Sequence, residues 1–315
     1  MLHAGPRRLG NDGMGGETMR DSASGSAADG AVTMTGKTVV ITGASAGIGA
    51  AAARQLAALG ARIVVLGRSP QKTAAVAAEV GATAVVADFA RFSEVRRAAA
   101  EVTELCPRID VLLNNAGGLF PGPMLTEDGN EMTIQVNHLA PFLLTGLLMP
   151  LLTATPGSRV VVTSSVVNVA GRIDVTDLNR YRRVLGVLGQ FAVYADSKLM
   201  NLLFARELAR RAAPDGPTAT AVHPGMINSE FGRSAWYMRR FYGRPLGLLG
   251  RVTAVETGAR PLVAVATRPD PETVNGAYLH RFRQRDRLFT PGQARDPELA
   301  RELWEVSTKL VGLPG

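Results

Sequence analysis

Short apolar runs rich in β-branched residues recur along the chain from Lys37 onward. Their residues are apolar at consecutive positions rather than at alternate ones, which indicates strands that are covered on both faces. Such strands are typical of parallel sheets, because the crossover helices shield both sides of the sheet. The expected strands are residues 38–43, 61–67, 82–88, 109–117, 158–165, 218–225 and 275–280.

Longer segments with an apolar spacing near 3.6 and many strong helix formers lie between these runs. The expected helices are residues 48–60, 70–81, 93–106, 131–152 and 192–213. Repeated strand–helix units with right-handed connections build a doubly wound sheet. The pattern therefore predicts a single α/β domain over 37–315, with a Rossmann-type doubly wound parallel sheet of about seven strands flanked by helices.

Two segments depart from this pattern. Residues 1–36 contain eight glycines and few large apolar groups, so we expect a disordered leader. Met34 would itself make a plausible start of the domain, which leaves open that the gene start is over-extended. Residues 226–251 mix aromatics, glycines and arginines, and we expect this irregular insertion to form a lid over a site.

Composition narrows the possible partners. The net charge of +8 comes from 35 basic residues, but only Lys37, Lys72, Lys198 and Lys309 are lysines. The arginines are scattered and form no stripe interleaved with aromatic residues. We therefore expect no nucleic-acid partner.

The cellular compartment is predicted from the absence of disulfide pairs, metal-site motifs, a membrane span and a signal peptide in the sequence. The single cysteine, Cys106, cannot form an internal disulfide, and no cysteine or histidine cluster has the spacing of a metal site. The longest nearly apolar run, residues 139–152, is too short to cross a bilayer and predicts a buried helix. Residues 1–36 lack the apolar region of a signal peptide. These features favour the cytoplasm, although the aromatic and basic residues of 236–251 leave peripheral membrane contact as a weaker alternative.

A glycine-rich turn, "TGASAGIG" (42–49), follows the first expected strand. Gly43, Gly47 and Gly49, with Ile48 between the last two, lead directly into the first helix. A tight turn that places a helix N-terminus against a ligand is suited to a pyrophosphate. The alternative is a purely structural turn.

The residues after the second strand favour NADP(H) over NAD(H). A carboxylate at this point would bind the 2′-hydroxyl of NAD, whereas this chain has Gly67, Arg68 and Ser69. The guanidinium of Arg68 can face a 2′-phosphate, and Ser45 in the glycine loop could add a hydroxyl. NAD(H), with Arg68 simply solvated, is the alternative.

Four motifs taken together resemble the short-chain dehydrogenase/reductase family: "TGASAGIG", "NNAG" (114–117), a serine after the fifth strand, and "YADSK" (194–198). The resemblance covers the chain from about Lys37 to its end. Residues 135–145, 199–211, 222–230 and 301–315 are similar to the retinol-dehydrogenase-like branch. That branch implies oxidation or reduction of hydrophobic alcohols and carbonyls, usually with NADP(H).

The resemblance also implies roles for individual residues. Asn137 would anchor a proton-relay water, and Ser165, rather than its neighbour Ser164, would be the catalytic serine. The threonine often found after the "PG" of the family is absent, and Ser229 stands nearby instead. The implied cofactor contacts are the Asp88 side chain and the Phe89 backbone at the adenine, and Pro224 and Gly225 against the nicotinamide. Asn115, Ala116 and Gly117 would line the adenine ribose and support the central sheet.

Tyr194 and Lys198 form the expected acid–base pair. A tyrosine can exchange a proton with an alcohol near neutral pH only if its pKa falls from about 10. Lys198, at i+4 on the same helical face, would stabilise the phenolate and hold the nicotinamide ribose. Asp196 points away from this face of the helix, so we expect its carboxylate to be exposed or to lie at the helix start. We expect Ser197 to be a close-packing neighbour of the pair.

These features together predict an oxidoreductase that transfers hydride between NADP(H) and a hydrophobic alcohol or carbonyl compound, such as a retinoid, a steroid or a long-chain aldehyde or ketone. The alternative is a catalytically silent NADP(H)-binding regulatory protein. The resemblance also implies a homo-oligomer that pairs through the long helices at 125–152 and 192–213.

Overall fold

The computed structural model describes Met1 and residues 32–120, 122, 124–179, 187–212, 214–225, 227, 253–285 and 289–314. Apart from Met1 and Val32, these residues belong to one compact unit, Thr33–Gly315. Most of the predicted leader, and the predicted lid except Ile227, lie outside the described residues. Met34 already belongs to the core, where its N–H donates to the carbonyl of Leu59.

An eight-stranded sheet forms the centre of the compact unit, in the order β3-β2-β1-β4-β5-β6-β7-β8. Seven strands are parallel, as predicted, and β8 adds a short antiparallel edge that was not expected. The order reverses between β1 and β4, so the sheet is doubly wound. The strands are β1 (Thr38–Thr42), β2 (Arg62–Gly67), β3 (Thr83–Val86), β4 (Val111–Asn114), β5 (Arg159–Thr163), β6 (Thr218–His223), β7 (Tyr278–His280) and β8 (Arg283–Gln284).

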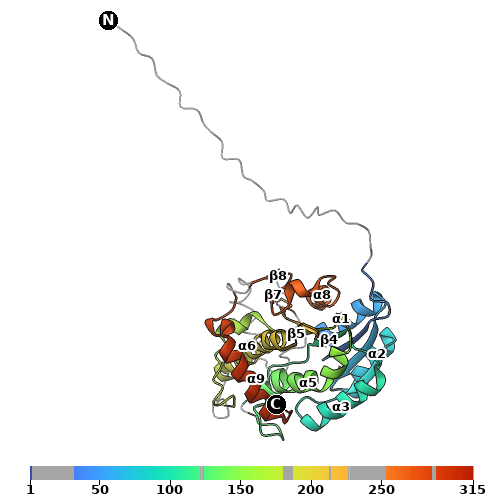
Figure 1. Cartoon of the computed structure of the whole chain (residues 1–315), viewed down its shortest axis with the longest axis horizontal. Coiled ribbons are helices and arrows are strands. Elements are labelled where there is room, and N and C mark those ends of the chain that lie inside the picture. Colours follow the sequence, from blue (N-terminus) through green and yellow to red (C-terminus); the bar gives the residue numbers. More distant parts are fainter. Residues whose placement is uncertain are drawn as a thin grey trace. The chain divides into compact units, whose positions relative to one another are not determined.

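Helices cover both faces of the sheet, and every expected helix is present (Figure 1). The helices α8 and α9, near the C-terminus, were not among the expected elements. The main helices are α1 (Gly47–Ala58), α2 (Pro70–Val80), α3 (Phe92–Leu105), α4 (Met132–Ile134), α5 (Ala140–Thr153), α6 (Val187–Ala212), α8 (Val255–Ala266) and α9 (Pro297–Val311). Shorter turns of helix are η1 (Gln135–Leu139), η2 (Val166–Ala170), η5 (Pro271–Val274) and η6 (Gly292–Arg295).

Successive residues of the central strand belong to two separate cores. Val40 packs in the cluster that α3, α5 and α6 contribute to, whereas Val39 and Ile41 pack in the cluster of α1, α2 and α8. Because side chains alternate across a strand, both faces of β1 are dry, which explains its uninterrupted apolar sequence.

The C-terminal helix α9 packs against α5 and α6. The Trp304 ring lies 4.8 Å from the Phe142 ring and 5.9 Å from the Phe204 ring, centroid to centroid. His138 Nε2 and Ser307 Oγ are hydrogen bonded at 2.9 Å. Pairing through α5 and α6 stays a prediction, and α9 lies on the same two helices.

The helical stretch Met132–Thr153 is long and apolar enough to cross a membrane, with a mean hydropathy of 1.4. However, 67% of its most apolar window is buried inside the protein. Its apolar character is therefore that of a core helix, as the sequence predicted for residues 139–152.

The contact between α9 and the core predicts a difference between two leucines of the same helix. Leu303 is 1% exposed, whereas Leu310 is 38% exposed. Leu303→Ala should lower the free energy of unfolding by about 2–5 kcal/mol, because it removes buried methyl groups and leaves a cavity. Leu310→Ala, the matched control, should change it by about 0.5 kcal/mol or less. Urea unfolding measures both, and equal effects would contradict the packing of α9.

Candidate active site

The loops that follow β1, β4, β5 and β6 meet at the carboxyl edge of the sheet, next to the point where the strand order reverses. Ligands of open α/β sheets bind at such a point. The sequence-predicted residues that the structure describes lie on these loops, on the loops after β2 and β3, or on the helices η1, α1 and α6.

The glycine loop is shaped by close backbone contacts. Gly43 and Gly47 have φ values of 65° and 59°, a region that glycine adopts without strain. A Cβ on Gly43 would lie 2.7 Å from Cα of Ala116, and one on Gly49 would lie 2.6 Å from Nδ2 of Asn115. The glycines therefore let the loop pack directly on the segment after β4.

The N-terminus of α1 directly follows the glycine loop. Its N-cap residue, Ala46, makes no side-chain cap hydrogen bond, as is also the case for the N-caps of α3 and α8. The first N–H groups of α1 therefore have no side-chain acceptor. Together with the close-packed glycines, they fit the pyrophosphate of a dinucleotide.

Asn115 and Ala116 hold the glycine loop in place. Asn115 Nδ2 donates to the Thr42 carbonyl at 3.0 Å, and the backbone N–H groups of Asn115 and Ala116 both donate to Thr42 Oγ1 at 3.0 Å. The "NNAG" segment thus braces the end of β1 and supports the central sheet, one of the two roles that the resemblance implied.

Ser45 of the glycine loop lies against Gly67, the residue before Arg68. A Cβ on Gly67 would lie 2.8 Å from Cβ of Ser45, so the glycine loop packs against the end of β2. Arg68 follows directly and is exposed. It forms no hydrogen bond or ion pair with the residues that the structure describes, so its guanidinium is available to a ligand.

Asp88 and Phe89 follow β3. Asp88 Oδ1 accepts from the Ala90 N–H at 3.0 Å, which fixes the carboxylate at the edge of the sheet. The Phe89 side chain is buried in the core. Only its backbone can face a ligand, in agreement with the role that the resemblance implied.

Tyr194 and Lys198 lie one turn apart on α6, as their spacing predicted. Lys198 Nζ lies 5.6 Å from the centroid of the Tyr194 ring and donates to the Thr163 carbonyl at 3.1 Å. The Lys198 ammonium is buried, and this loss of solvent lowers its pKa from 10.5 to about 8.

The two serines after β5 differ in their surroundings. Ser164 is buried, and its hydroxyl donates to the Lys198 carbonyl at 2.8 Å. Ser165 is only half-buried, and its hydroxyl accepts a long 3.5 Å bond from the Val167 N–H. Ser164 therefore fastens β5 to α6, and Ser165 is the serine whose hydroxyl is available to a ligand.

Asn168 and Tyr278 secure the loop that carries Ser165. Asn168 Nδ2 donates to the Ser165 carbonyl at 2.5 Å and to Tyr278 Oη at 3.0 Å. Both side chains are fully buried, and burial raises the pKa of the Tyr278 phenol. This pair was not expected from the sequence, because residues 110 positions apart leave no local signal of contact.

Asn137 lies within a π-helical turn, η1, that interrupts the long helix between α4 and α5. Such turns are frequent at functional sites. Asn137 Oδ1 accepts from the Gly118 N–H at 2.8 Å, and Nδ2 donates to the Gly118 carbonyl and to Ser197 Oγ, each at 3.0 Å. The side chain thus joins the loop after β4 to α6.

Gly117 gives Lys198 its space. A Cβ at this position would lie 3.0 Å from Asn137 Oδ1 and 3.3 Å from Lys198 Nζ. A larger residue would push against the buried ammonium, so Gly117 bounds the Lys198 side chain rather than only lining a ribose site.

The prediction for Asp196 is wrong, whereas that for Ser197 is confirmed. Asp196 is buried, and its Oδ1 accepts from the Arg172 N–H at 2.6 Å, because the loop after η2 folds over this face of α6. Ser197 is fully buried, and its hydroxyl donates to the Tyr194 carbonyl at 2.7 Å. Ser229 lies outside the described residues.

Pro224 and Gly225 follow β6, next to two histidines. His223 and His280 are neighbours on β6 and β7, with ring centroids 4.8 Å apart. Burial, His280 and Arg281 lower the pKa of His223 to about 3, so its imidazole is neutral at physiological pH. Gly225 has a φ of 106°, which only glycine adopts readily.

Comparison with known proteins agrees with this geometry. A family model described as short chain dehydrogenase matches residues 37–177. Human retinol dehydrogenase 13 is 37% identical, covering 94% of this chain and 90% of the relative. The chain belongs to the short-chain dehydrogenase family. Its relatives also place it near retinol dehydrogenases, as the sequence motifs indicated.

Two further members extend the comparison. Polyprenol dehydrogenase of Mus musculus is 38% identical to this short-chain dehydrogenase, covering 89% of this chain and 85% of the relative. The crystal structure of a short chain dehydrogenase from Burkholderia cenocepacia J2315 in complex with NADP has a TM-score of 0.61 and 29% identity. The structural match covers 78% of this chain and 96% of the Burkholderia chain.

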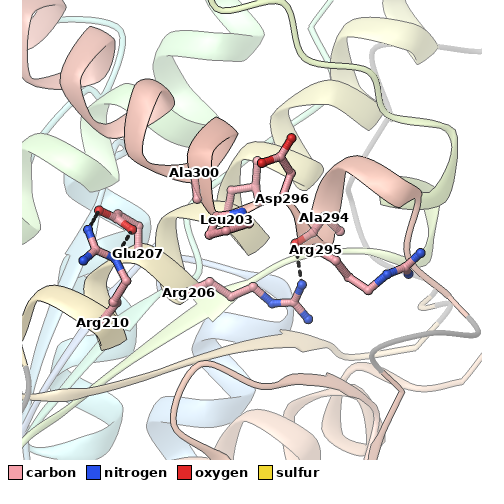
Figure 2. Close-up of a pocket in the computed structure, with 9 residues that line it drawn as sticks. Leu203, Arg206, Glu207, Arg210, Ala294, Arg295, Asp296 and Ala300 are labelled. Carbon is pink, nitrogen blue, oxygen red and sulfur yellow. Dashed lines mark hydrogen bonds and ion pairs between the residues drawn. The ribbon is translucent and has the colours of Figure 1, made fainter.

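A small cavity of about 120 Å³ lies elsewhere in this short-chain dehydrogenase, where α6 meets η6 and the start of α9 (Figure 2). Glu207 Oε1 is paired with Arg210 Nη2 at 2.5 Å, and Arg206 donates to the Ala294 carbonyl. Asp296 caps α9 by accepting from the Glu298 N–H. These polar groups already have hydrogen-bond partners within the protein. The cavity is therefore a packing gap between helices rather than a second active site.

Within the described part of the chain, no group of three or more histidine, cysteine, aspartate or glutamate residues could hold a metal ion. Cys106 is buried at the end of α3, and burial raises the pKa of its thiol. His138 is buried, and this lowers its pKa to about 4. Its bond to Ser307 joins η1 to α9, which gives it a structural role.

The buried ammonium of Lys198 predicts a pH dependence of stability. Between its folded pKa of about 8 and its ordinary value of 10.5, the unfolded chain binds a proton that the folded chain lacks. The free energy of unfolding therefore gains a contribution that rises with pH in this window. Relative to Lys198→Met, the wild type should gain stability from pH 8 to pH 10.5, as measured by urea unfolding of the cofactor-free protein.

The exposed Lys309 offers a matched control, because Lys309→Met removes one ammonium and leaves Lys198 buried. This variant should keep the wild-type pH dependence. Parallel stability curves for the wild type and Lys198→Met would contradict the lowered pKa of Lys198.

Proposed function

We propose that this short-chain dehydrogenase is an NADP(H)-dependent oxidoreductase for hydrophobic alcohols and carbonyl compounds, such as retinoids, steroids or long-chain aldehydes and ketones. The observation that carries the proposal is the pair of Tyr194 and Lys198 on one face of α6, with the buried Lys198 ammonium 5.6 Å from the phenol ring.

Tyr194 is the proton donor and acceptor. The nicotinamide, when bound, supplies or accepts the hydride. Reduction of a carbonyl leaves an oxyanion, and the Tyr194 hydroxyl gives it a proton; in the reverse direction the phenolate removes that proton from the alcohol. The charge of Lys198 favours the phenolate, and this attraction is strong because both side chains are buried.

Ser165 and Asn137 complete the proposed catalytic set. The half-buried hydroxyl of Ser165 donates to the developing oxyanion and orients the substrate. Asn137 positions Lys198 through the loop after β4. Its side chain accepts a hydrogen bond from the Gly118 N–H, and the adjoining Gly117 borders the Lys198 ammonium. Exchange of a proton between Lys198 and solvent would pass beside Asn137.

The preference for NADP(H) rests on Arg68 and Ser45. The exposed Arg68 follows β2 directly, and Ser45 lies against the preceding residue, Gly67. A guanidinium and a hydroxyl form charge-assisted hydrogen bonds with a phosphate. The related short chain dehydrogenase that was solved with NADP supports the same choice.

The preference for a hydrophobic substrate is supported by the relatives. Two of them are named for retinol and polyprenol, which are long apolar alcohols. The alternative of a catalytically silent regulatory protein is less favoured, because this chain keeps both Tyr194 and Lys198. A cytoplasmic location remains a prediction.

Removal of the proton donor should separate chemistry from binding. Tyr194→Phe should lower kcat by about 100-fold or more, because an effective general acid contributes about 10²–10⁴-fold. Ser165→Ala should lower kcat by a similar factor through loss of the oxyanion donor. NADPH oxidation with retinal, steroid and medium-chain carbonyl compounds measures kcat, and fluorescence titration measures NADPH affinity, which should persist in both variants.

Ser164→Ala is the matched control for Ser165→Ala. It should lower stability by about 1 kcal/mol through loss of the bond to the Lys198 carbonyl, with a much smaller effect on kcat. If Ser164→Ala lost more activity than Ser165→Ala, the assignment of the serine would be wrong. If the wild type reduced no carbonyl compound while binding NADPH, the regulatory alternative would hold.

Arg68→Ala should weaken NADPH binding by about 10- to 100-fold, because hydrogen bonds to charged groups contribute about 1.5–3 kcal/mol. NADH binding should change little. Arg301→Ala removes the same charge from a partly exposed position on α9, which packs against α5 and α6, and should alter neither affinity. An equal loss of NADPH and NADH affinity in Arg68→Ala would contradict a 2′-phosphate contact.

A further inference from the structure

Arg281 occupies a backbone position that normally belongs to glycine. Its φ is 59°, and within the described residues it is the single non-glycine residue with a positive φ. It directly follows β7 and begins the two-residue turn to β8, where tight hairpins favour glycine. Residues that are held in this strained region cluster at functional sites.

The Arg281 side chain lies against the loop after β6. The backbone N–H of Arg281 donates to the His223 carbonyl at 2.8 Å, which fixes the turn beside the end of β6. A Cβ added to Gly225 would lie 3.8 Å from Nε and 3.9 Å from Cδ and Cγ of Arg281. The side chain therefore runs along Gly225, at the same edge of the sheet as Ser165.

The surroundings of Arg281 carry positive charge that no described acidic group neutralises. Arg281, Arg283 and Arg285 form no ion pair with the residues that the structure describes. Arg281 and Arg285 also lower the pKa of His280, after the larger effect of burial. An exposed guanidinium with no partner among the described residues is suited to a carboxylate.

The strand order decides between the cofactor and the substrate as the source of an anionic group. In the order β1-β4-β5-β6-β7, Arg281 follows a strand four places from β1, which precedes the glycine loop. At about 4.8 Å per strand this is about 19 Å. Ser165 follows β5, only two places away, or about 10 Å.

We propose that Arg281 binds a carboxylate of the substrate, at the end remote from the reacting carbonyl group. The site would then accept an apolar chain with a carbonyl near Ser165 and Tyr194 and an anionic group near Gly225. This inference rests on the proposed function and narrows its substrate class to amphipathic carbonyl acids.

The test compares 10-oxodecanoate with its methyl ester, which has the same chain without the charge. Calorimetry on the protein saturated with NADP⁺ measures binding in the absence of turnover. The wild type should bind the acid about 10-fold or more tightly than the ester, and Arg281→Gly should abolish that difference. Arg281→Gly should also raise Tm by about 2–4 °C, because glycine relieves the strained turn.

Arg283→Gly, in the same hairpin, is the control for general loss of charge and should retain the preference for the acid. The inference is overturned if the wild type binds both compounds equally, if Arg281→Gly keeps the preference, or if Arg281→Gly instead weakens NADPH binding 10-fold. Failure of the proposed function is a separate result: neither compound would support NADPH oxidation, whereas the binding comparison would still decide the role of Arg281.

Discussion

The site is organised around one buried charge, the ammonium of Lys198. Loss of solvent lowers its pKa to about 8, and the Thr163 carbonyl accepts a hydrogen bond from it. Burying a charge in this way is unfavourable unless the surrounding structure compensates. Gly117 provides the space for the ammonium, and Ser164 fixes the Lys198 backbone. A charge held this close to Tyr194 acts in a medium that screens it far less than water does.

The fold was largely predictable because its cause is local. The inner parallel strands are apolar at consecutive positions and most helices are apolar on one face, and these periodicities are visible in a single sequence. The spacing of Tyr194 and Lys198 was also sufficient to predict that they share one helical face, because a helix fixes the relative direction of residues four apart. The choice of Ser165 over Ser164 came from resemblance alone, and the structure supplies the physical reason that Ser164 already has a partner.

The features of the fold and of the site that could not be predicted depend on contacts between distant parts of the chain. Helix periodicity gave the correct direction for Asp196 but could not show that the loop at Arg172 covers it. The bond between Asn168 and Tyr278 joins residues 110 positions apart. The packing of Trp304 on Phe142 likewise has no sequence signal, so α9 was not expected. Such contacts depend on the complete fold, and propensity does not encode them.

Arg68 and Arg281, which form no ion pair with the described residues, lie toward opposite ends of the same sheet edge. Arg68 follows β2 and Arg281 follows β7, on either side of the point where the strand order reverses. The strands between them carry the glycine loop, the Asn115 brace and the serine of the site, which any dinucleotide oxidoreductase of this geometry needs. The inner strands are paired on both sides and packed on both faces, so their loops are constrained by many contacts. The turn after β7 has only the short β8 beyond it and can change with little effect on the core, so substrate selectivity is most easily altered there.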